Sequence, residues 1–376
     1  MTCVLEAADP RDVGMDPGRL GRIDAVIERA IAAGTIPGAV VLVSRSGKVV
    51  KHTGYGMAME IPEQRPMCTA TIFDLASLTK VMVTVPLSLM LVEQGLWSLR
   101  DPVARFFPQL GWGDQVTIWH LLTHTAGLPP WMNLFHLGRG RDRVLEFLCS
   151  HRWPVAPLTQ DPGRRVIYSD LGYILVGAAI EKVTGERLDV LASTWLFTPL
   201  GMSDTMFNPR PELAHRIAAT EHDPNRGGVL VGTVHDENAW AMDGVAGHAG
   251  LFSTAKDVAI YAQMLLNGGV YGEQRLLSPR SVEVMTSPHA EGLNERRGLG
   301  WMLQGSGTLS AGDLLSERAF GHTGFTGTSL WVDPEYALIV VLLTNRVHPS
   351  RDRGAAEIAG LRASVNNVAA GAIVDG

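Results

Sequence analysis

The chain has 376 residues, 46% of them hydrophobic and 19% charged, which is typical of a globular protein of enzyme size. Its 38 acidic and 32 basic residues give a formal net charge of -6 without any basic run, so nucleic acid and anionic membranes are poor candidates as partners. Cys3, Cys68 and Cys149 are too few and too scattered for a disulfide framework or a thiolate metal site, and they indicate a reducing compartment.

No segment reaches the length of a membrane span without charges, and residues 1–14 hold no apolar run long enough for a signal peptide. We therefore expect a cytoplasmic protein, or a periplasmic or extracellular one if a leader sequence has been removed.

The first elements are a surface helix and a hairpin. Apolar residues recur at helical period over residues 17–33, and the pattern breaks at Gly34. Residues 39–44 and 48–53 are β-branched runs separated by Ser46 and Gly47, which predicts two antiparallel strands.

Residues 77–94 form a strongly apolar segment whose valines and leucines recur at helical spacing, so we expect a buried helix that starts near Ser77. Residues three apart share one helix face, which brings the Lys80 amine within reach of the Ser77 hydroxyl. A serine needs a base to become a nucleophile, and a buried lysine can be that base because burial lowers its pKa. Taken alone, the same spacing is more often a capping serine followed by a solvated lysine.

The middle of the chain, residues 101–269, is broken by proline and glycine into helical pieces at 118–122, 143–149, 171–183 and 258–266. Strand patterns return at 299–303, 319–322, 328–332 and 337–344, followed by a helix over 351–365. We predict an α+β fold in which both chain ends build one antiparallel sheet, flanked by helices, around a mostly helical middle. The expected regions are 1–75, 76–289 and 290–376, forming one catalytic unit with the site at their interface.

Two further stretches carry polar side chains at element boundaries. Tyr168, Ser169 and Asp170 stand at the start of a buried helix, where a helix cap is the plain alternative. His322-Thr323-Gly324 lies between two predicted strands, and a glycine-rich strand edge allows a substrate to approach the backbone closely. An ordinary hairpin is the alternative there.

In this order, Ser77-x-x-Lys80, Tyr168-Ser169-Asp170 and His322-Thr323-Gly324 resemble the active-site elements of the serine β-lactamase and penicillin-binding-protein superfamily. The closer resemblance is to the class C β-lactamase-like branch, with its family VIII carboxylesterases and low-molecular-mass penicillin-binding hydrolases. Residues 121–129 and 244–255 also resemble segments of that branch, so the similarity covers roughly residues 15–345. It implies a β-lactamase/transpeptidase-like fold.

The resemblance also implies roles for single residues. Ser77 is similar to the nucleophile that becomes acylated, Lys80 to its partner base, and Tyr168 to the tyrosine that shares proton transfer. The backbone N–H groups of Ser77 and Phe325 would form the oxyanion hole. Four residues would contact the substrate: Asp170, His322, Thr323 and Gly324.

Two positions depart from the class C pattern and argue against an efficient β-lactamase. Asp170 stands where asparagine is usual, so it lacks an amide donor but can pair with Lys80. His322 stands where lysine is usual, and an imidazole with a reference pKa of ~6.5 is only partly charged near neutral pH. We therefore expect any preference for carboxylate-bearing substrates to grow as the pH falls.

Histidines elsewhere are weaker candidates for function. His120 and His124 are four apart, as zinc ligands are, but no glutamate lies between them, and residues 235–237 with His248 form another such group. A structural loop is favoured for the first pair, and loop hydrogen bonding or a cleft lining for the second group, so we expect no metal. Three aromatic residues are candidates either for an acyl-pocket wall or for plain core: Trp131, Phe135 and Trp240.

We therefore predict a serine hydrolase that works through a covalent acyl-enzyme, without metal or organic cofactor, and that favours small carboxylic esters. The alternatives are a D-amino-acid carboxypeptidase acting on peptides or muropeptides, a weak β-lactamase, and a non-catalytic scaffold or acyl-ligand sensor. The joint presence of serine, lysine and tyrosine weighs against the last of these. The absence of any Gly-x-Ser-x-Gly excludes an α/β-hydrolase elbow. The expected partner is a small ester, peptide or β-lactam, and the sequence does not predict an oligomeric state.

Overall fold

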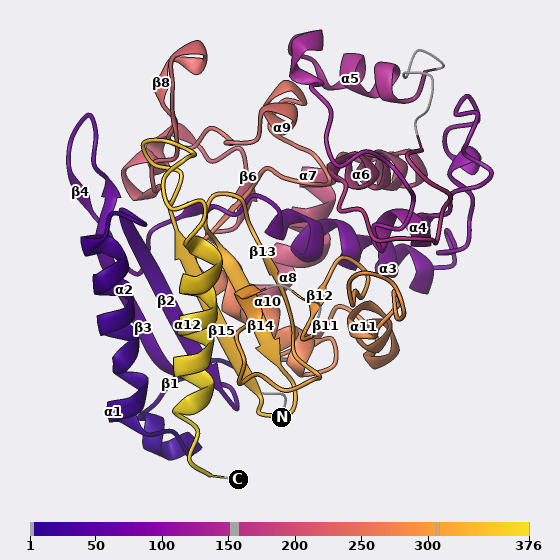
Figure 1. The fold of residues 1–376 in the computed structure, drawn as a ribbon. Helices are drawn as coiled ribbons and strands as arrows, with labels where there is room; N and C mark the ends of the chain where they lie inside the picture. The colour runs from indigo at the N-terminus through magenta and orange to yellow at the C-terminus, as the bar shows by residue number, and fades with distance from the viewer. Residues whose placement is uncertain (1–3, 151–157, 306, 308, 376) are drawn as a thin grey trace.

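A computed structural model describes residues 4–150, 158–305, 307 and 309–375. Its centre is an eight-stranded sheet with the order β1-β3-β2-β15-β14-β13-β12, in which β4 also pairs with β3 (Figure 1). These strands are β1 (Glu6–Ala7), β2 (Gly38–Arg45), β3 (Lys48–Met59), β4 (Arg65–Pro66), β12 (Met302–Leu303), β13 (Phe320–Thr323), β14 (Ser329–Asp333) and β15 (Leu338–Thr344).

The two chain ends meet in the middle of this sheet. β2 pairs with β15 in antiparallel register, with Val41 opposite Leu342, so the predicted α+β sheet built from both ends is confirmed. The sheet is not wholly antiparallel as expected, because β1 joins β3 in parallel, with Glu6 opposite Lys48. A strand of two residues is too short to show the alternation that predicts strands.

Side chains on the central strands alternate between two cores, as the period of a strand requires. On β15, Val341 and Leu343 belong to the larger core, which includes the helical middle of the chain, and Val340 and Leu342 belong to the smaller core on the other face. Three helices cover that other face: α1 (Pro17–Leu20), α2 (Arg22–Ala32) and α12 (Ile358–Gly371).

The predicted helical pieces of the middle region are present. They are α4 (Ile118–Leu122), α5 (Arg141–Leu148), α6 (Asp170–Thr184) and α10 (Ala255–Leu266), together with α3 (Val85–Glu93), α7 (Leu188–Leu191), α8 (Thr198–Leu200), α9 (Glu237–Ala241) and α11 (Pro279–Thr286). Helix α10 packs directly on β2 and β15 and so covers part of the sheet.

Short elements complete the chain. The small strands are β5 (Phe73–Asp74), β6 (Met206–Phe207), β7 (His222–Asp223), β8 (Gly228–Val229), β9 (Leu251–Ser253), β10 (Val270–Tyr271) and β11 (Gln274–Arg275). The 3₁₀ turns are η1 (Pro10–Val13), η3 (Val103–Arg105), η4 (Phe135–Leu137), η6 (Pro211–Arg216), η7 (Pro224–Arg226) and η8 (Leu309–Ala311), and two π-helical turns are η2 (Lys80–Thr84) and η5 (Ala192–Phe197).

Two predicted elements near the C-terminal end of the chain differ from the structure. The last helix begins at Ile358, not at residue 351. Arg346 Nη1 donates to the backbone carbonyls of Arg351 and Arg353, each at 2.7 Å, and these carbonyls would otherwise accept the N–H groups of a helix. The strand expected over residues 299–303 is reduced to β12, since Gly300 has φ of 77° and breaks the extended backbone.

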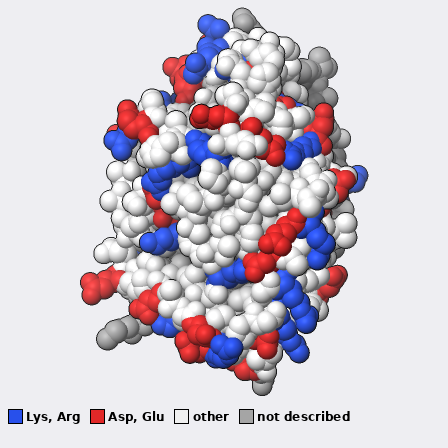
Figure 2. Space-filling model, turned by 90° about the vertical axis from the view of Figure 1, so that its left-hand side faces the viewer, with Lys and Arg blue, Asp and Glu red and all other residues white. Residues whose placement is uncertain are grey.

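Three features considered in the sequence can be located in the described residues: the cysteines, the apolar helices and the surface charges. Cys68 and Cys149 are free thiols, whereas Cys3 lies outside the described part of the chain. None of the helices in that part is long and apolar enough to cross a membrane. On the face shown in Figure 2, acidic and basic side chains are interspersed, in keeping with the small net charge.

Candidate active site

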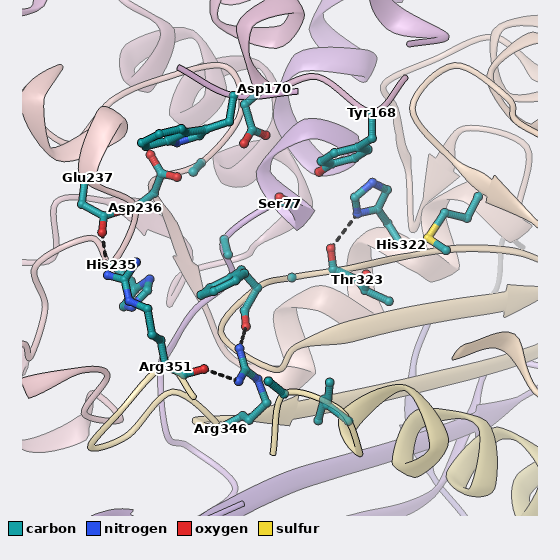
Figure 3. Close-up of a pocket in the computed structure, with 18 of the residues that line it drawn as sticks. Ser77, Tyr168, Asp170, His235, Asp236, Glu237, His322, Thr323, Arg346 and Arg351 are labelled. Carbon is teal, nitrogen blue, oxygen red and sulfur yellow. Dashed lines mark hydrogen bonds and ion pairs between the residues drawn. The ribbon is translucent and has the colours of Figure 1, made fainter. Parts of the chain in front are cut away.

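A pocket of about 830 Å³ brings together side chains from the helical middle and from the edge of the sheet (Figure 3). The residues predicted for the site that line it are Ser77, Tyr168, Asp170, His322, Thr323, Gly324 and Phe325. Lys80 does not line the pocket, because its side chain is fully buried behind Ser77.

A strained turn sets the position of Ser77. Ala76, directly before it, has φ of 47°, in the left-handed region that costs a residue with a Cβ about 1 kcal/mol or more. The buried carboxylate of Asp74 holds this turn, because it accepts the N–H of Ala76 at 2.9 Å and that of His235 at 2.6 Å. The turn therefore presents Ser77 at the start of the following helix.

That helix is not regular, contrary to the expectation of one helix over residues 77–94. The π-helical turn η2 comes first, in which Val85 N–H bonds to Lys80 O, and α3 follows. Pro86 explains the break, since it has no N–H to give to the preceding turn. The Tyr261 hydroxyl supplies the missing donor to the Val81 carbonyl at 2.6 Å.

Lys80 is the centre of the polar network. Its Nζ donates to Ser77 Oγ at 2.9 Å and to the carbonyl oxygen of His248 at 3.0 Å, and it forms an ion pair with Asp170 Oδ1 at 2.7 Å. The Tyr168 hydroxyl is within hydrogen-bonding reach of both Lys80 and Ser77.

Charge in this network opposes the effect of burial. Burial acts to lower the pKa of Lys80, but the negative charge of Asp170 and the Tyr168 oxygen outweigh it and raise that pKa above its ordinary value. Burial also raises the pKa of Tyr168, against the effect of Lys80. The prediction that burial gives Lys80 a lowered pKa is therefore wrong in direction. At neutral pH the resting site holds a proton on both groups.

The Tyr168 ring is packed between rings and cations. The His124 ring lies 4.5 Å away between centroids, and Lys80 Nζ lies 4.9 Å from the ring centroid. His124 Nδ1 accepts the N–H of Ser169 at 3.0 Å, which ties the loop before α6 to the loop after α4. His124 thus supports Tyr168, as the favoured structural-loop interpretation predicts.

The turn between β13 and β14 is joined to the chain just before Ser77. Thr326 Oγ1 donates to the Asp74 carbonyl at 2.7 Å, and Thr328 Oγ1 donates to the Leu75 carbonyl at 3.0 Å. A Cβ on Gly324 would lie 2.1 Å from Thr328 Oγ1, so only glycine fits this close approach. Within the described residues, the N–H groups of Ser77 and Phe325 donate to no acceptor.

His322 is buried and neutral. Its Nδ1 donates to the carbonyl of Thr323 at 2.8 Å, and its Nε2 has no partner among the described residues. Burial, followed by the charges of Arg297 and Lys80, holds the pKa of His322 well below its usual range. The expected partly charged imidazole is therefore wrong, because the sequence does not show which cations surround it.

The opposite wall of the pocket carries His235, Asp236 and Glu237, and His248, the fourth member of the second histidine group, is buried and does not line the pocket. His248 Nε2 lies 2.8 Å from Asp236 Oδ1, and His235 Nε2 lies 2.9 Å from Glu221 Oε2. In the described ranges, no three or more histidine, cysteine or acidic side chains are arranged to hold a metal ion. Of the aromatic candidates, Trp131 and Phe135 line the pocket, and Trp240 lines a smaller cavity beside it.

The sequence did not indicate Arg297. This residue lines the pocket with only 4% of its surface exposed, and its guanidinium carbon lies 5.4 Å from the Tyr168 ring centroid. Arg296 and Arg297 are adjacent, and nothing in their pattern shows which one turns inward.

Comparison with known proteins assigns the family. A model of the Beta-lactamase family matches residues 23–364. The chain belongs to this family. The match confirms both the resemblance found in the sequence and its extent over nearly the whole chain.

Two relatives and one solved structure show how wide the family is. The chain is 37% identical over 369 residues to the N-acetylmuramyl-L-alanine amidase of Bacillus subtilis (strain 168), covering 88% of this chain and 81% of that protein. It is 34% identical over 382 residues to a putative D-alanyl-D-alanine carboxypeptidase of Salmonella agona (strain SL483), covering 92% and 87%. The structure of EstCE1, a hydrolase with promiscuous acyltransferase activity, matches with a TM-score of 0.73 at 27% identity, covering 94% of this chain and 99% of EstCE1.

Proposed function

We propose that the protein is a serine hydrolase that cleaves acyl bonds through a covalent intermediate on Ser77. The observation that carries this proposal is the buried contact of 2.9 Å between Lys80 Nζ and Ser77 Oγ at the wall of an open pocket. A serine that only caps a helix needs no such partner, and neither does a scaffold that has lost catalysis.

The reaction begins from the form of the Lys80–Tyr168 pair that has lost one proton. This pair accepts the Ser77 proton while Ser77 Oγ attacks the carbonyl carbon of the substrate. The negative oxygen that results accepts hydrogen bonds from the N–H groups of Ser77 and Phe325, which have no other acceptor in the described chain. The carbon–oxygen or carbon–nitrogen bond then breaks, and the leaving group takes the proton from the pair. Water, activated by the same pair, releases the acid from Ser77.

Small carboxylic esters are the first substrate class, as the sequence predicts. An ester has a better leaving group than an amide, and the exposed rings of Trp131 and Phe325 at the pocket suit an apolar acyl chain. The match to EstCE1, a hydrolase with promiscuous acyltransferase activity, supports the transfer of an acyl group.

Amide bonds of cell-wall peptides are the second candidate, supported by two relatives named as an amidase and a putative D-alanyl-D-alanine carboxypeptidase. An amine must be protonated to leave, and the raised pKa values of Lys80 and Tyr168 keep protons available for it. Steady-state rates on a short ester, an N-acetylmuramyl peptide and a D-alanyl-D-alanine peptide will rank the two classes.

Intact-mass spectrometry tests the nucleophile. A fluorophosphonate should add one label to each chain of the wild type and none to Ser77→Ala. The same substitution should lower kcat for an activated ester by at least ~10³-fold, as in other covalent serine enzymes. A Ser77→Ala variant that keeps most of its turnover, or still takes the label, would show that another residue is the nucleophile.

A further inference from the structure

The pair formed by Asp236 and His248 has no part in the chemistry proposed above. His248 is only 1% exposed and does not line the pocket, and its Nε2 donates to Asp236 Oδ1 at 2.8 Å. The same carboxylate oxygen accepts the N–H of Ala239 at 2.7 Å, at the start of α9. Asp236 lies in the pocket wall (Figure 3), and it therefore holds the imidazole of His248 from that side.

The backbone of His248 reaches the proton network. Its carbonyl oxygen accepts Lys80 Nζ at 3.0 Å. Two other contacts of this amine, with Ser77 Oγ and Asp170 Oδ1, involve groups that exchange protons or carry charge. A backbone carbonyl does neither, so its contribution is to hold the end of a flexible side chain in one place.

We propose that His248, held by Asp236, is a positioning residue that keeps the Lys80 amine in place for proton transfer from Ser77. The inference rests on the proposed function and deepens it, because the side chain of His248 touches neither the pocket nor the reacting atoms. Position matters at this point, since a misplacement of about 1 Å can lower the rate of an enzyme by ~10²-fold.

The residue before His248 is held by contacts of its own. Thr84 Oγ1 donates to the Gly247 carbonyl at 2.6 Å. A Cβ on Gly247 would lie 2.1 Å from the Tyr173 carbonyl oxygen, so glycine permits the close packing of this segment against α6. The His248 carbonyl, however, turns with the ψ angle of His248 itself. The hydrogen bond from the imidazole to Asp236 is therefore the contact that fixes His248 and, with it, the direction of this carbonyl.

His248 cannot replace Lys80 as the base. Its second ring nitrogen, Nδ1, is buried and has no partner among the described residues. The imidazole does not line the pocket, so it lies out of reach of a substrate or a water molecule there. Its contribution to the reaction passes through Lys80.

Two substitutions of His248 test this role. His248→Phe keeps a ring but loses the donor to Asp236, whereas the amide nitrogen of His248→Gln can take the place of Nε2. We expect His248→Phe to lower kcat for an activated ester by about tenfold or more, with KM within about twofold of the wild type, because the base moves and the pocket does not. His248→Gln should restore kcat to within about threefold of the wild type. The rate at which a fluorophosphonate labels Ser77 should follow kcat in both variants.

His52→Phe is the matched control. His52 is half-buried on β3, within hydrogen-bonding reach of the Thr69 backbone, and it does not line the pocket. This substitution should change neither kcat nor the labelling rate. Urea denaturation of each variant gives the folded fraction under the assay conditions, so that a loss of folded enzyme is not taken for a loss of kcat.

Substitutions of Asp236 test the other end of the pair and keep the proposal testable if His248→Phe does not fold. Asp236→Asn retains an oxygen that accepts from His248, and it should keep kcat within about threefold of the wild type, whereas Asp236→Ala should lose about as much as His248→Phe. The double variant His248→Phe/Asp236→Ala should be no slower than the slower single variant, because the two residues act as a unit. Equal losses in Asp236→Asn and Asp236→Ala would assign the effect to charge and overturn the positioning role.

The labelling experiment separates this inference from the proposed function. A wild type that hydrolyses no ester and takes no label at Ser77 overturns the proposed function, and this inference with it. A labelled wild type together with a folded His248→Phe that keeps its kcat overturns the inference alone. The same holds if His248→Gln is as slow as His248→Phe.

Discussion

Asp170 determines the charge of the proton network around Ser77. Its carboxylate lies 2.7 Å from Lys80 Nζ, and its negative charge contributes most to raising the pKa of the lysine against burial. A raised pKa means that the form of the Lys80–Tyr168 pair able to accept a proton is scarce at neutral pH. Activity should therefore increase as the pH rises above neutrality.

Asp170→Asn should shift this pH dependence toward acid. Without the negative charge the pKa of Lys80 falls, so the reactive form is populated at lower pH, and the rising limb of kcat/KM should move by about one unit or more. The measurement is kcat/KM against pH for a neutral substrate, the butyrate ester of 3-hydroxybenzamide. Asp114→Asn, at an exposed carboxylate, is the control and should leave the limb in place. An unmoved limb in Asp170→Asn would show that Asp170 does not set the proton affinity of the pair.

For single residues, the sequence predicted well which side chains meet at the site, but it predicted poorly their charges and the directions of their pKa shifts. Ser77 and Lys80 were found because a known pattern spaces them three residues apart, and Tyr168 because it belongs to a second short motif of the same family; the structure brings the three together. Arg297 was not found, because its approach to Tyr168 and His322 depends on tertiary packing. The same packing reversed the expected pKa direction of Lys80 and removed the expected charge of His322.

Short elements, not the long ones, position the nucleophile. β5 ends at Asp74, and the turn that follows carries the left-handed Ala76 before Ser77. Asp74 accepts two backbone N–H groups, one from this turn and one from His235 across the pocket. The Asp74 carboxylate thus holds the turn before Ser77 in its left-handed conformation and links that turn to His235 on the other wall of the pocket.

Asp74→Asn should harm both stability and catalysis. The amide can accept only one of the two N–H groups, and we expect a loss of about 1–3 kcal/mol in the free energy of unfolding. Because Ser77 then moves relative to its partners, kcat should fall more than KM rises. Urea denaturation and steady-state kinetics measure the two effects. Asp257→Asn removes a comparable buried carboxylate, which accepts Asp204 N–H at 2.8 Å and Thr205 Oγ1 at 2.9 Å, but should leave kcat unchanged. Equal kcat losses in the two variants would contradict a specific role for Asp74.

The sequence predicted the long strands of the fold but not the strands of two residues. The strands β2, β3, β14 and β15 are five or more residues long, and their apolar patterns predicted them. β1 and β5 have two residues each and show no period. The π-helical turn before α3 depends on one proline and a distant tyrosine hydroxyl, which periodicity does not detect.

Elements on both faces of the central sheet contribute residues to the pocket that holds Ser77. Helix α12 lies on the outer face beside α2 (Figure 1), far in sequence from Ser77. Its Arg362 is nevertheless buried at the pocket, where Nη2 donates to the carbonyls of Gly324 at 2.8 Å and Thr328 at 3.0 Å. The C-terminal helix therefore fixes the turn that carries the Phe325 amide.

Arg362→Met tests this link across the molecule. The side chain is similar in length but removes the guanidinium donor from the carbonyls of Gly324 and Thr328, which then keep only their backbone N–H donors. We expect the loss of these charge-assisted hydrogen bonds to lower the free energy of unfolding by about 1–3 kcal/mol. If the turn moves, the Phe325 N–H no longer faces the developing oxyanion, and kcat for a neutral ester should fall about tenfold or more, since a lost oxyanion donor costs ~10²–10³. Burial lowers the pKa of Arg362 to about 9, so both measurements belong near pH 7, where the wild-type residue is charged. Ser364→Met, at an exposed position on the same helix, should change neither quantity. A variant that is less stable but keeps its kcat would show that α12 supports the fold without positioning the site.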